Sequence, residues 1–144
     1  MSFALAFCAA SVGAGVAAAD FRTTSDQPTV LYDGPSTKSR PQFLYGRDVP
    51  VEVIVSVEGW IKVRDAGGTI GWIERKSLGD KRMLLVTGPT AEARARPEEG
   101  APAAFSAAQN VTLELIEVAP NGWLRVRHAD GATGYVRAAQ VWGN

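Results

Sequence analysis

The fold of this chain is decided by a stretch that occurs twice, as EGWIKVRDAGGTIGWI over residues 58–73 and as NGWLRVRHADGATGYV over residues 121–136. Aligning residues 58–78 with residues 121–141 gives seven identities in 21 positions, where unrelated segments of this composition would share roughly one or two. The identical pairs are Gly59/Gly122, Trp60/Trp123, Val63/Val126, Arg64/Arg127, Ala66/Ala129, Gly68/Gly131 and Gly71/Gly134. An internal duplication is the simplest explanation, and it predicts two small units with the same architecture.

Each copy alternates apolar and polar residues between glycine-containing turns, which is typical of short β-strands. In the first copy, residues 51–57 place four valines on one face of an extended segment, and residues 60–64 and 69–73 supply two further strands. No sustained helical period occurs after the first 19 residues. We therefore expect an all-β fold of meandering strands that close into two small barrels.

The boundaries of the units follow from changes in composition along the chain. Tight 3₁₀ turns are predicted over residues 74–77 and 137–140, each before a last apolar residue. Each unit has about 60 residues, which is near the lower limit for burying a core, so we expect the units to lean on each other. The predicted segments are a signal peptide over residues 1–19, a lead-in over 20–28, a first barrel over 29–86, a linker over 87–90 and a second barrel over 91–144.

The first 19 residues are uncharged, and their apolar run ends in Ala17-Ala18-Ala19, which fits the small-x-small rule for signal-peptide cleavage. We expect cleavage after Ala19 and export to the periplasm or medium, with no transmembrane segment in the mature chain. No Lys or Arg precedes the apolar run. A membrane anchor and lipid attachment at Cys8 are the alternatives; the run is short for a span, and bulky Phe7 argues against the lipid. Cleavage after Ala19 would leave no cysteine for a disulfide.

Charge excludes two classes of partner. The chain has 15 basic and 15 acidic residues, all after residue 19. Divided near Thr87, the first unit has ten basic and nine acidic residues, and the second has five and six. Neither unit carries the field that would attract nucleic acid or anionic lipid, so we expect no nucleic-acid partner.

The repeated string Gly-Trp-x-x-Val…Gly…Gly-aromatic-Ile/Val resembles the bacterial Src-homology-3-type (SH3-like) domain. That family consists of small exported β-barrels found in tandem or beside cell-wall enzymes. The resemblance covers nearly all of residues 29–144 and implies two tandem SH3-like barrels that recognise a cell-wall peptide, peptidoglycan or a partner protein. The first copy has the family's Gly-Pro-Ser turn at residues 34–36, whereas the second has ARARPEEG over residues 93–100.

Residues that could support catalysis are few. His128 is the only histidine, and its counterpart in the first copy is Asp65. Neither a metal shell nor a nucleophile–base pair can be assembled around it. Glu98 and Glu99 are adjacent in a predicted loop, and no serine lies near a base in the sequence. We therefore predict a protein that is not an enzyme and needs no cofactor or metal.

Outward aromatic residues are the predicted binding site. Alternation sends Ile61, Val63 and Ile73 inward in the first copy and Leu124, Val126 and Val136 inward in the second. The aromatic neighbours then form a flat shelf that suits extended peptides or amino-sugar polymers. The candidate ligand-binding residues are Trp60, Trp72, Tyr32 and Tyr45 in the first copy and Trp123 and Tyr135 in the second.

Two other interpretations remain open at this point. The rings could pack beneath the loop of residues 37–45, between the two units or between protomers, which would indicate a structural or assembly role. The chain could also be an accessory part of a cell-wall enzyme system or a cryptic hydrolase.

Overall fold

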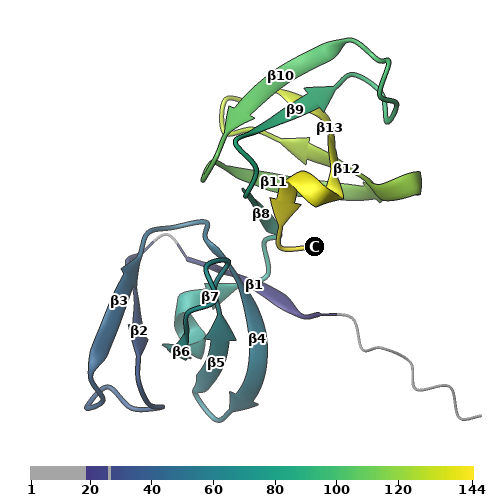
Figure 1. The fold of residues 1–144 in the computed structure, drawn as a ribbon. Helices are drawn as coiled ribbons and strands as arrows, with labels where there is room; N and C mark the ends of the chain where they lie inside the picture. The colour runs from purple at the N-terminus through teal and green to yellow at the C-terminus, as the bar shows by residue number, and fades with distance from the viewer. Residues whose placement is uncertain (1–18, 26) are drawn as a thin grey trace, which may run out of the picture.

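The computed structural model describes residues 19–25 and 27–144, which form two strongly curled sheets of seven strands each (Figure 1). The predicted signal peptide lies outside the described residues except for Ala19. The first sheet has the strand order β3-β2-β6-β5-β4-β1-β7, and the second has β10-β9-β13-β12-β11-β8-β14. The second order is the first with seven added to every number, so the duplication extends to the whole topology.

The strands are short, as the glycine-punctuated sequence predicts. The first sheet contains β1 (Phe21–Thr24), β2 (Thr29–Tyr32), β3 (Pro41–Tyr45), β4 (Pro50–Val57), β5 (Trp60–Arg64), β6 (Ile70–Glu74) and β7 (Leu78–Gly79). The second contains β8 (Met83–Val86), β9 (Thr90–Arg94), β10 (Ala103–Ala108), β11 (Thr112–Ala119), β12 (Trp123–Arg127), β13 (Thr133–Arg137) and β14 (Val141–Trp142). The 3₁₀ turns are η1 (Arg75–Ser77), η2 (Pro120–Gly122) and η3 (Ala138–Gln140), and η1 and η3 confirm the two predicted turns.

Two predicted boundaries are wrong because short strands cross them. The segment over residues 20–28 is not a lead-in, since β1 pairs with both β4 and β7. Strand β8, predicted within the first barrel, pairs with β11 and β14 of the second sheet. A strand of four residues is too short to show periodicity. In β1 the polar Thr24 is buried because its hydroxyl donates to the Gly46 carbonyl (2.7 Å) and accepts from the Val49 N–H (2.9 Å).

The prediction that the four valines of residues 51–57 share one face is wrong, because β4 contains a β-bulge. The pairing with β5 shifts between Val53 and Val55, and β11 shifts at the equivalent place between Leu115 and Glu117. One extra residue reverses the alternation of the following side chains. Val55 and Val57 are consequently exposed, so the four valines do not share a buried face.

Each sheet encloses its own core of branched aliphatic residues. Ile61, Val63 and Ile73 are buried in the first unit, as predicted. The corresponding Leu124, Val126 and Val136 are buried in the second. Closure of the barrels is incomplete: within the described residues, edge strands β3 and β7 each pair with one neighbour rather than with each other.

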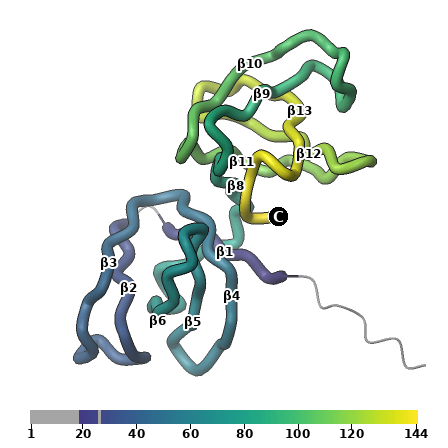
Figure 2. The backbone as a smooth tube through the Cα atoms, viewed as in Figure 1, coloured from purple at the N-terminus to yellow at the C-terminus, as the bar shows by residue number. Residues whose placement is uncertain are grey.

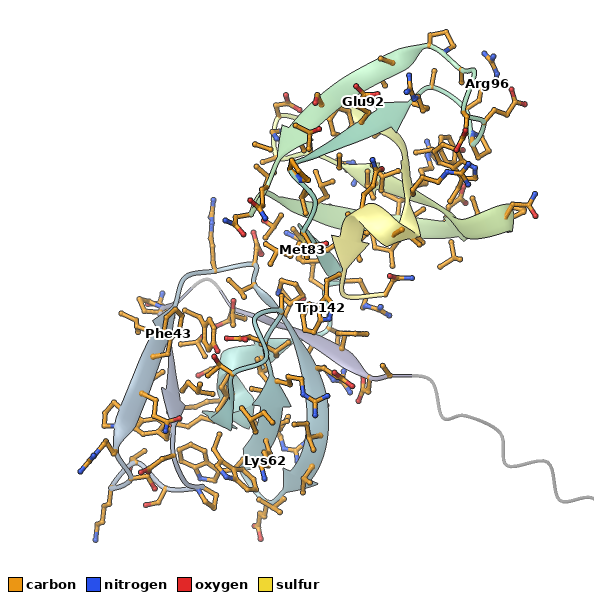
Figure 3. All side chains as sticks on the ribbon, in the orientation of Figure 1. Phe43, Lys62, Met83, Glu92, Arg96 and Trp142 are labelled. Atoms are coloured by element: carbon orange, nitrogen blue, oxygen red, sulfur yellow. The ribbon has the colours of Figure 1, made fainter. Side chains whose placement is uncertain are left out.

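The C-terminal end of the chain lies between the two units, near β8 and β1 (Figure 2), and Trp142 lies at this junction (Figure 3). The rings of Phe21 and Trp142 meet edge to face with their centroids 5.1 Å apart. The Arg82 guanidinium lies 5.8 Å from the centre of the Phe21 ring and donates to the Gly143 carbonyl (2.9 Å). The two units therefore contact each other, as expected. The aromatic residues in this contact, Phe21 and Trp142, are not among the predicted ligand-binding residues.

Candidate functional site

A groove runs across the end of the first unit between the β2–β3 loop and the turn after β6. Its volume is about 710 Å³, within the range of about 300–1,000 Å³ typical of small-ligand sites. Gly59 leads into Trp60 at the start of β5, and the indole and Pro35 are apolar parts of the wall. The groove is lined by Pro35, Ser36, Thr37, Gly59, Trp60, Glu74, Arg75 and Lys76.

Three predicted aromatic residues lie together on the outer side of this sheet. Tyr32 lies opposite Trp72 across β2 and β6, and Trp72 lies opposite Lys62 across β6 and β5. Directly opposed residues share a face of the sheet. The Tyr32 ring also meets the Trp60 ring edge to face, with the centroids 5.5 Å apart. All three rings are half-buried, so they are fixed by their neighbours yet still accessible.

Charged groups surround the Trp60 end of the groove. Glu74 is directly opposite Trp60 in the β5–β6 pairing, so its carboxylate lies on the same face as the indole. Lys76 Nζ is 3.1 Å from the Glu74 carboxylate, and the Lys76 side chain is 83% exposed. Arg75 donates to the Val57 carbonyl (2.8 Å), which holds its side chain across the adjacent strand. The groove thus combines an indole, a carboxylate and two cations at its rim.

Tyr45 does not belong to this groove, contrary to the prediction. It pairs with Thr29, at the opposite end of β2 from Tyr32, and is buried in the core. Its hydroxyl donates to Asp65 Oδ2 (2.8 Å). Burial, together with this hydrogen bond to a carboxylate, raises the pKa of Tyr45 well above its ordinary value. Its role in this structure is to join β3 to the β5–β6 turn.

The loop that borders the groove keeps its shape in the second copy despite losing the Gly-Pro-Ser sequence. Each loop has eight residues between its strands, 33–40 and 95–102. In the first, Ser36 N–H donates to Gly34 O (2.9 Å), and in the second Glu98 N–H donates to Arg96 O (2.8 Å). The turn geometry is therefore set by the backbone, and the side chains in the groove have been free to diverge.

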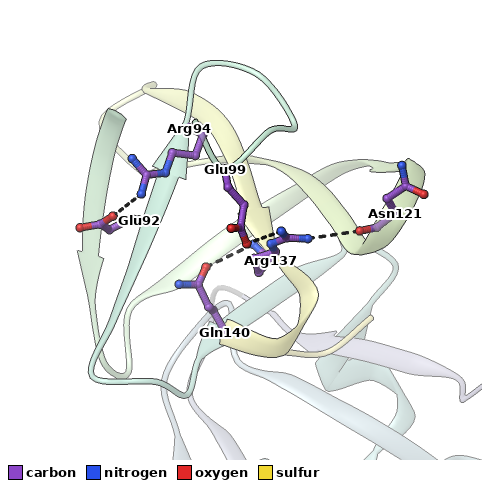
Figure 4. Close-up of polar contacts among 6 residues, drawn as sticks. All are labelled: Glu92, Arg94, Glu99, Asn121, Arg137 and Gln140. Atoms are coloured by element: carbon purple, nitrogen blue, oxygen red, sulfur yellow. Dashed lines mark hydrogen bonds and ion pairs between the residues drawn. The ribbon is translucent and has the colours of Figure 1, made fainter. Parts of the chain in front are cut away.

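In the second copy the equivalent groove is filled by its own side chains (Figure 4). The Arg137 guanidinium lies 4.2 Å from the centre of the Trp123 ring and forms an ion pair with Glu99. Trp123 is only 4% exposed, so the prediction of an outward shelf is wrong for this residue. The remaining space is about 250 Å³ and is bordered by Glu92, Arg94, Glu99, Trp123, Arg137 and Gln140.

Tyr135 remains half-buried on the outer face, but its neighbours differ from those of Trp72. It lies opposite Arg125 on one side and Arg94 on the other. Arg94 occupies the place of Tyr32 and pairs with Glu92 (2.7 Å). The aromatic surface of the first copy is therefore not reproduced in the second.

His128 occupies a structural turn. The Asp130 N–H donates to His128 Nδ1 (3.2 Å), and the imidazole contacts the Phe105 ring with centroids 5.7 Å apart. A hydrogen bond from the Ala132 N–H holds the pKa of Asp130 below its ordinary value. In the described part of the chain, no three His, Cys, Asp or Glu side chains are grouped so that they could hold a metal ion.

Sequence reasoning missed the polar half of the first groove. Thr37, Glu74, Arg75 and Lys76 carry no motif, and their position depends on the loop folding back toward β6. One signal was present in the repeat: Glu74 aligns with Arg137, a reversal of charge two residues after aligned Trp72 and Tyr135. The two copies therefore carry opposite charges at the position that lies opposite Trp60 in one sheet and opposite Trp123 in the other.

The comparison with protein families agrees with this geometry. The family model described as "Bacterial SH3 domain" matches two regions, residues 25–80 and 87–143. The chain therefore belongs to the bacterial SH3 domain family, and it carries two tandem copies of that domain. No curated protein matches the chain. Among residues 19–25 and 27–144, no helix has the length and apolar character needed to cross a membrane.

Solved structures with some similarity include two proteins from Trichomonas vaginalis. NlpC2 is 17% identical over 88% of this chain and 49% of its own, and NlpC1 is 15% identical over 90% and 48%. An NlpC/P60 family protein from Bacillus cereus is 16% identical over 85% of this chain and 56% of its own. Each has a TM-score of 0.40. This chain spans about half the length of these proteins.

Proposed function

We propose that this protein is an exported, non-catalytic recognition module that binds an extended cell-wall peptide in the groove of its first bacterial SH3 domain. The observation that carries the proposal is the open groove of about 710 Å³ beside Trp60, with Tyr32 and Trp72 on the adjoining face. Aromatic rings with polar edges suit extended peptides, because they supply contact area at low conformational cost. Membership of the family supports the cell wall as the source of that peptide.

The second domain serves a different purpose in this proposal. Its groove is filled by Arg137 and Glu99, so one bound peptide per chain is expected. The contact between Phe21 and Trp142 holds this domain against the first. The second domain thereby supports the binding domain at the end remote from the groove.

Co-sedimentation with purified peptidoglycan sacculi tests the proposal. We expect the wild-type protein to pellet with sacculi and the Trp60→Ala/Trp72→Ala variant to stay in the supernatant. Phe43→Ala is the matched control, because Phe43 is a 53% exposed aromatic residue on β3 that does not line the groove. A folded double variant that pellets as well as Phe43→Ala would refute this site.

The exported location has its own test. Cleavage after Ala19 would give a mature protein that begins at Asp20. Fractionation of the native host followed by N-terminal sequencing should find that end in the envelope or periplasmic fraction. An intact Met1 in the cytoplasmic fraction would contradict the location.

A further inference from the structure

We infer that the groove of the first domain takes a cationic side chain of its ligand, an ammonium or guanidinium group, over the face of Trp60 and beside Glu74. The inference rests on the function proposed above and specifies the chemistry of the ligand. Its basis is a comparison of the two copies, which place the same indole in the same backbone setting with different charges around it.

The second domain shows what this indole position accepts. The Arg137 guanidinium lies over Trp123 at 4.2 Å from the ring centre, close enough for a cation–π interaction. The same guanidinium pairs with Glu99 and donates to the Asn121 carbonyl (3.4 Å), while the Gln140 side chain accepts from the Arg137 backbone N–H (Figure 4). An indole, a carboxylate and a carbonyl thus surround one cation.

The first domain has the same positions with one component missing. Trp60 lies opposite Glu74 in its sheet, just as Trp123 lies opposite Arg137 in the other. The two bordering loops are equal in length, so Thr37 corresponds to Glu99. The carboxylate is therefore retained beside the indole but comes from the opposite wall. The internal cation has been replaced, and the space it would fill is open.

The chain's own cations do not occupy that space. In the described part of the chain, the two cation–π contacts are those of Arg82 with Phe21 and Arg137 with Trp123. Lys76 contacts Glu74, yet its side chain is 83% exposed, and a solvated pair of this kind contributes little. A ligand cation held against the Trp60 indole can therefore replace Lys76 as the partner of the Glu74 carboxylate. Arg75 and Lys76 are both exposed at the rim, where solvent and salt screen their repulsion of that cation.

Chemically modified sacculi test the charge requirement directly, whichever wall peptide is bound. Acetylation of free amino groups removes their positive charge, whereas guanidination with O-methylisourea retains it. We expect binding of the wild-type protein to acetylated sacculi to be about tenfold weaker than to untreated sacculi. Binding to guanidinated sacculi should stay within about twofold, since a guanidinium group suits an indole face as well as an ammonium does.

The outcomes separate this inference from the proposed function. Unchanged binding to acetylated sacculi, together with loss of binding in Trp60→Ala/Trp72→Ala, would overturn the cation and leave the groove as the site. Full binding by Trp60→Ala/Trp72→Ala would overturn both.

A second experiment transfers the closed arrangement of the second domain into the first. In Thr37→Glu/Glu74→Arg, the introduced guanidinium should lie over Trp60 and pair with the introduced carboxylate, so binding to untreated sacculi should fall at least about tenfold. Glu74→Gln, which keeps the shape and removes the charge, should lower binding by about threefold to fivefold. Both variants alter partly exposed positions, and an unfolding midpoint equal to that of the wild type verifies folding. Wild-type binding by the folded Thr37→Glu/Glu74→Arg variant would overturn the inference.

Discussion

Strand β6 passes β2 so closely at Gly71 that this position has no room for a side chain. A Cβ atom there would lie 2.7 Å from Leu31 Cγ, 2.8 Å from Leu31 Cδ1 and 2.8 Å from the Tyr32 carbonyl oxygen. The oxygen belongs to the backbone of β2, so it can move only if the strand moves. We therefore predict that Gly71→Ala destabilises the protein by about 2 kcal/mol, within the range of about 1–3 kcal/mol for overpacking a core.

Urea unfolding followed by tryptophan fluorescence measures this loss. With an m-value of about 1.5 kcal/mol per M, a loss of about 2 kcal/mol lowers the midpoint by about 1.3 M. Gly46→Ala is the control, because a Cβ atom at Gly46 meets nothing within 4 Å, and it should stay within about 0.5 kcal/mol of the wild type. If Gly71→Ala and Gly46→Ala unfold at the same urea concentration, the argument from close strand contact is refuted.

Three further predictions concern the core, the junction and the filled groove. Because the folded protein raises the pKa of Tyr45, its contribution to stability is present below about pH 10 and is lost at higher pH. Tyr45→Phe should therefore cost about 1 kcal/mol at about pH 8 and flatten the decline in unfolding free energy between about pH 10 and 12; an unchanged decline would contradict this. Trp142→Ala removes the ring that meets Phe21, and we expect the unfolding transition measured by calorimetry to split or broaden as the units uncouple; a single unshifted transition would contradict it. Acrylamide should quench the fluorescence of Trp123→Phe more efficiently than that of the wild type, because this change deletes the 4% exposed, protected indole; equal quenching would show that Arg137 does not shield it.

The parts of the fold that local sequence determines were predictable. Alternation within β5 and β6 identifies Ile61 and Ile73 as core residues, because neighbouring side chains on a strand must face opposite sides. The 3₁₀ turns η1 and η3 are also recognisable from local sequence, because each copy of the repeat has its turn directly before a last apolar residue. These features depend on residues that are close in sequence.

The features that escape prediction depend on distant partners. The four residues of β1 become a strand only because β4 and β7 supply hydrogen bonds on both sides. The bulge in β4 reverses the faces of Val55 and Val57, and no residue type at that place announces it. Alternation predicts that Trp123 faces outward, and its ring does leave the aliphatic core. The Arg137 guanidinium of the neighbouring strand lies over the buried ring, and alternation along one strand cannot predict that contact.

The two domains keep the same loop frame, although the groove is open in the first and filled by Arg137 in the second. Backbone hydrogen bonds preserve the bordering loop in both domains, from Asp33 N–H to Arg40 O (3.0 Å) in one and from Ala95 N–H to Pro102 O (2.8 Å) in the other. With the frame fixed, side chains at two aligned places decide whether the indole is covered, and substitutions there leave the aliphatic core untouched. Surface changes of this kind alter stability by only about 0.5 kcal/mol. The same frame can therefore hold either an open groove or an internal ion pair at little cost to folding, and in the first domain Glu74 stands where the second has the Arg137 cation.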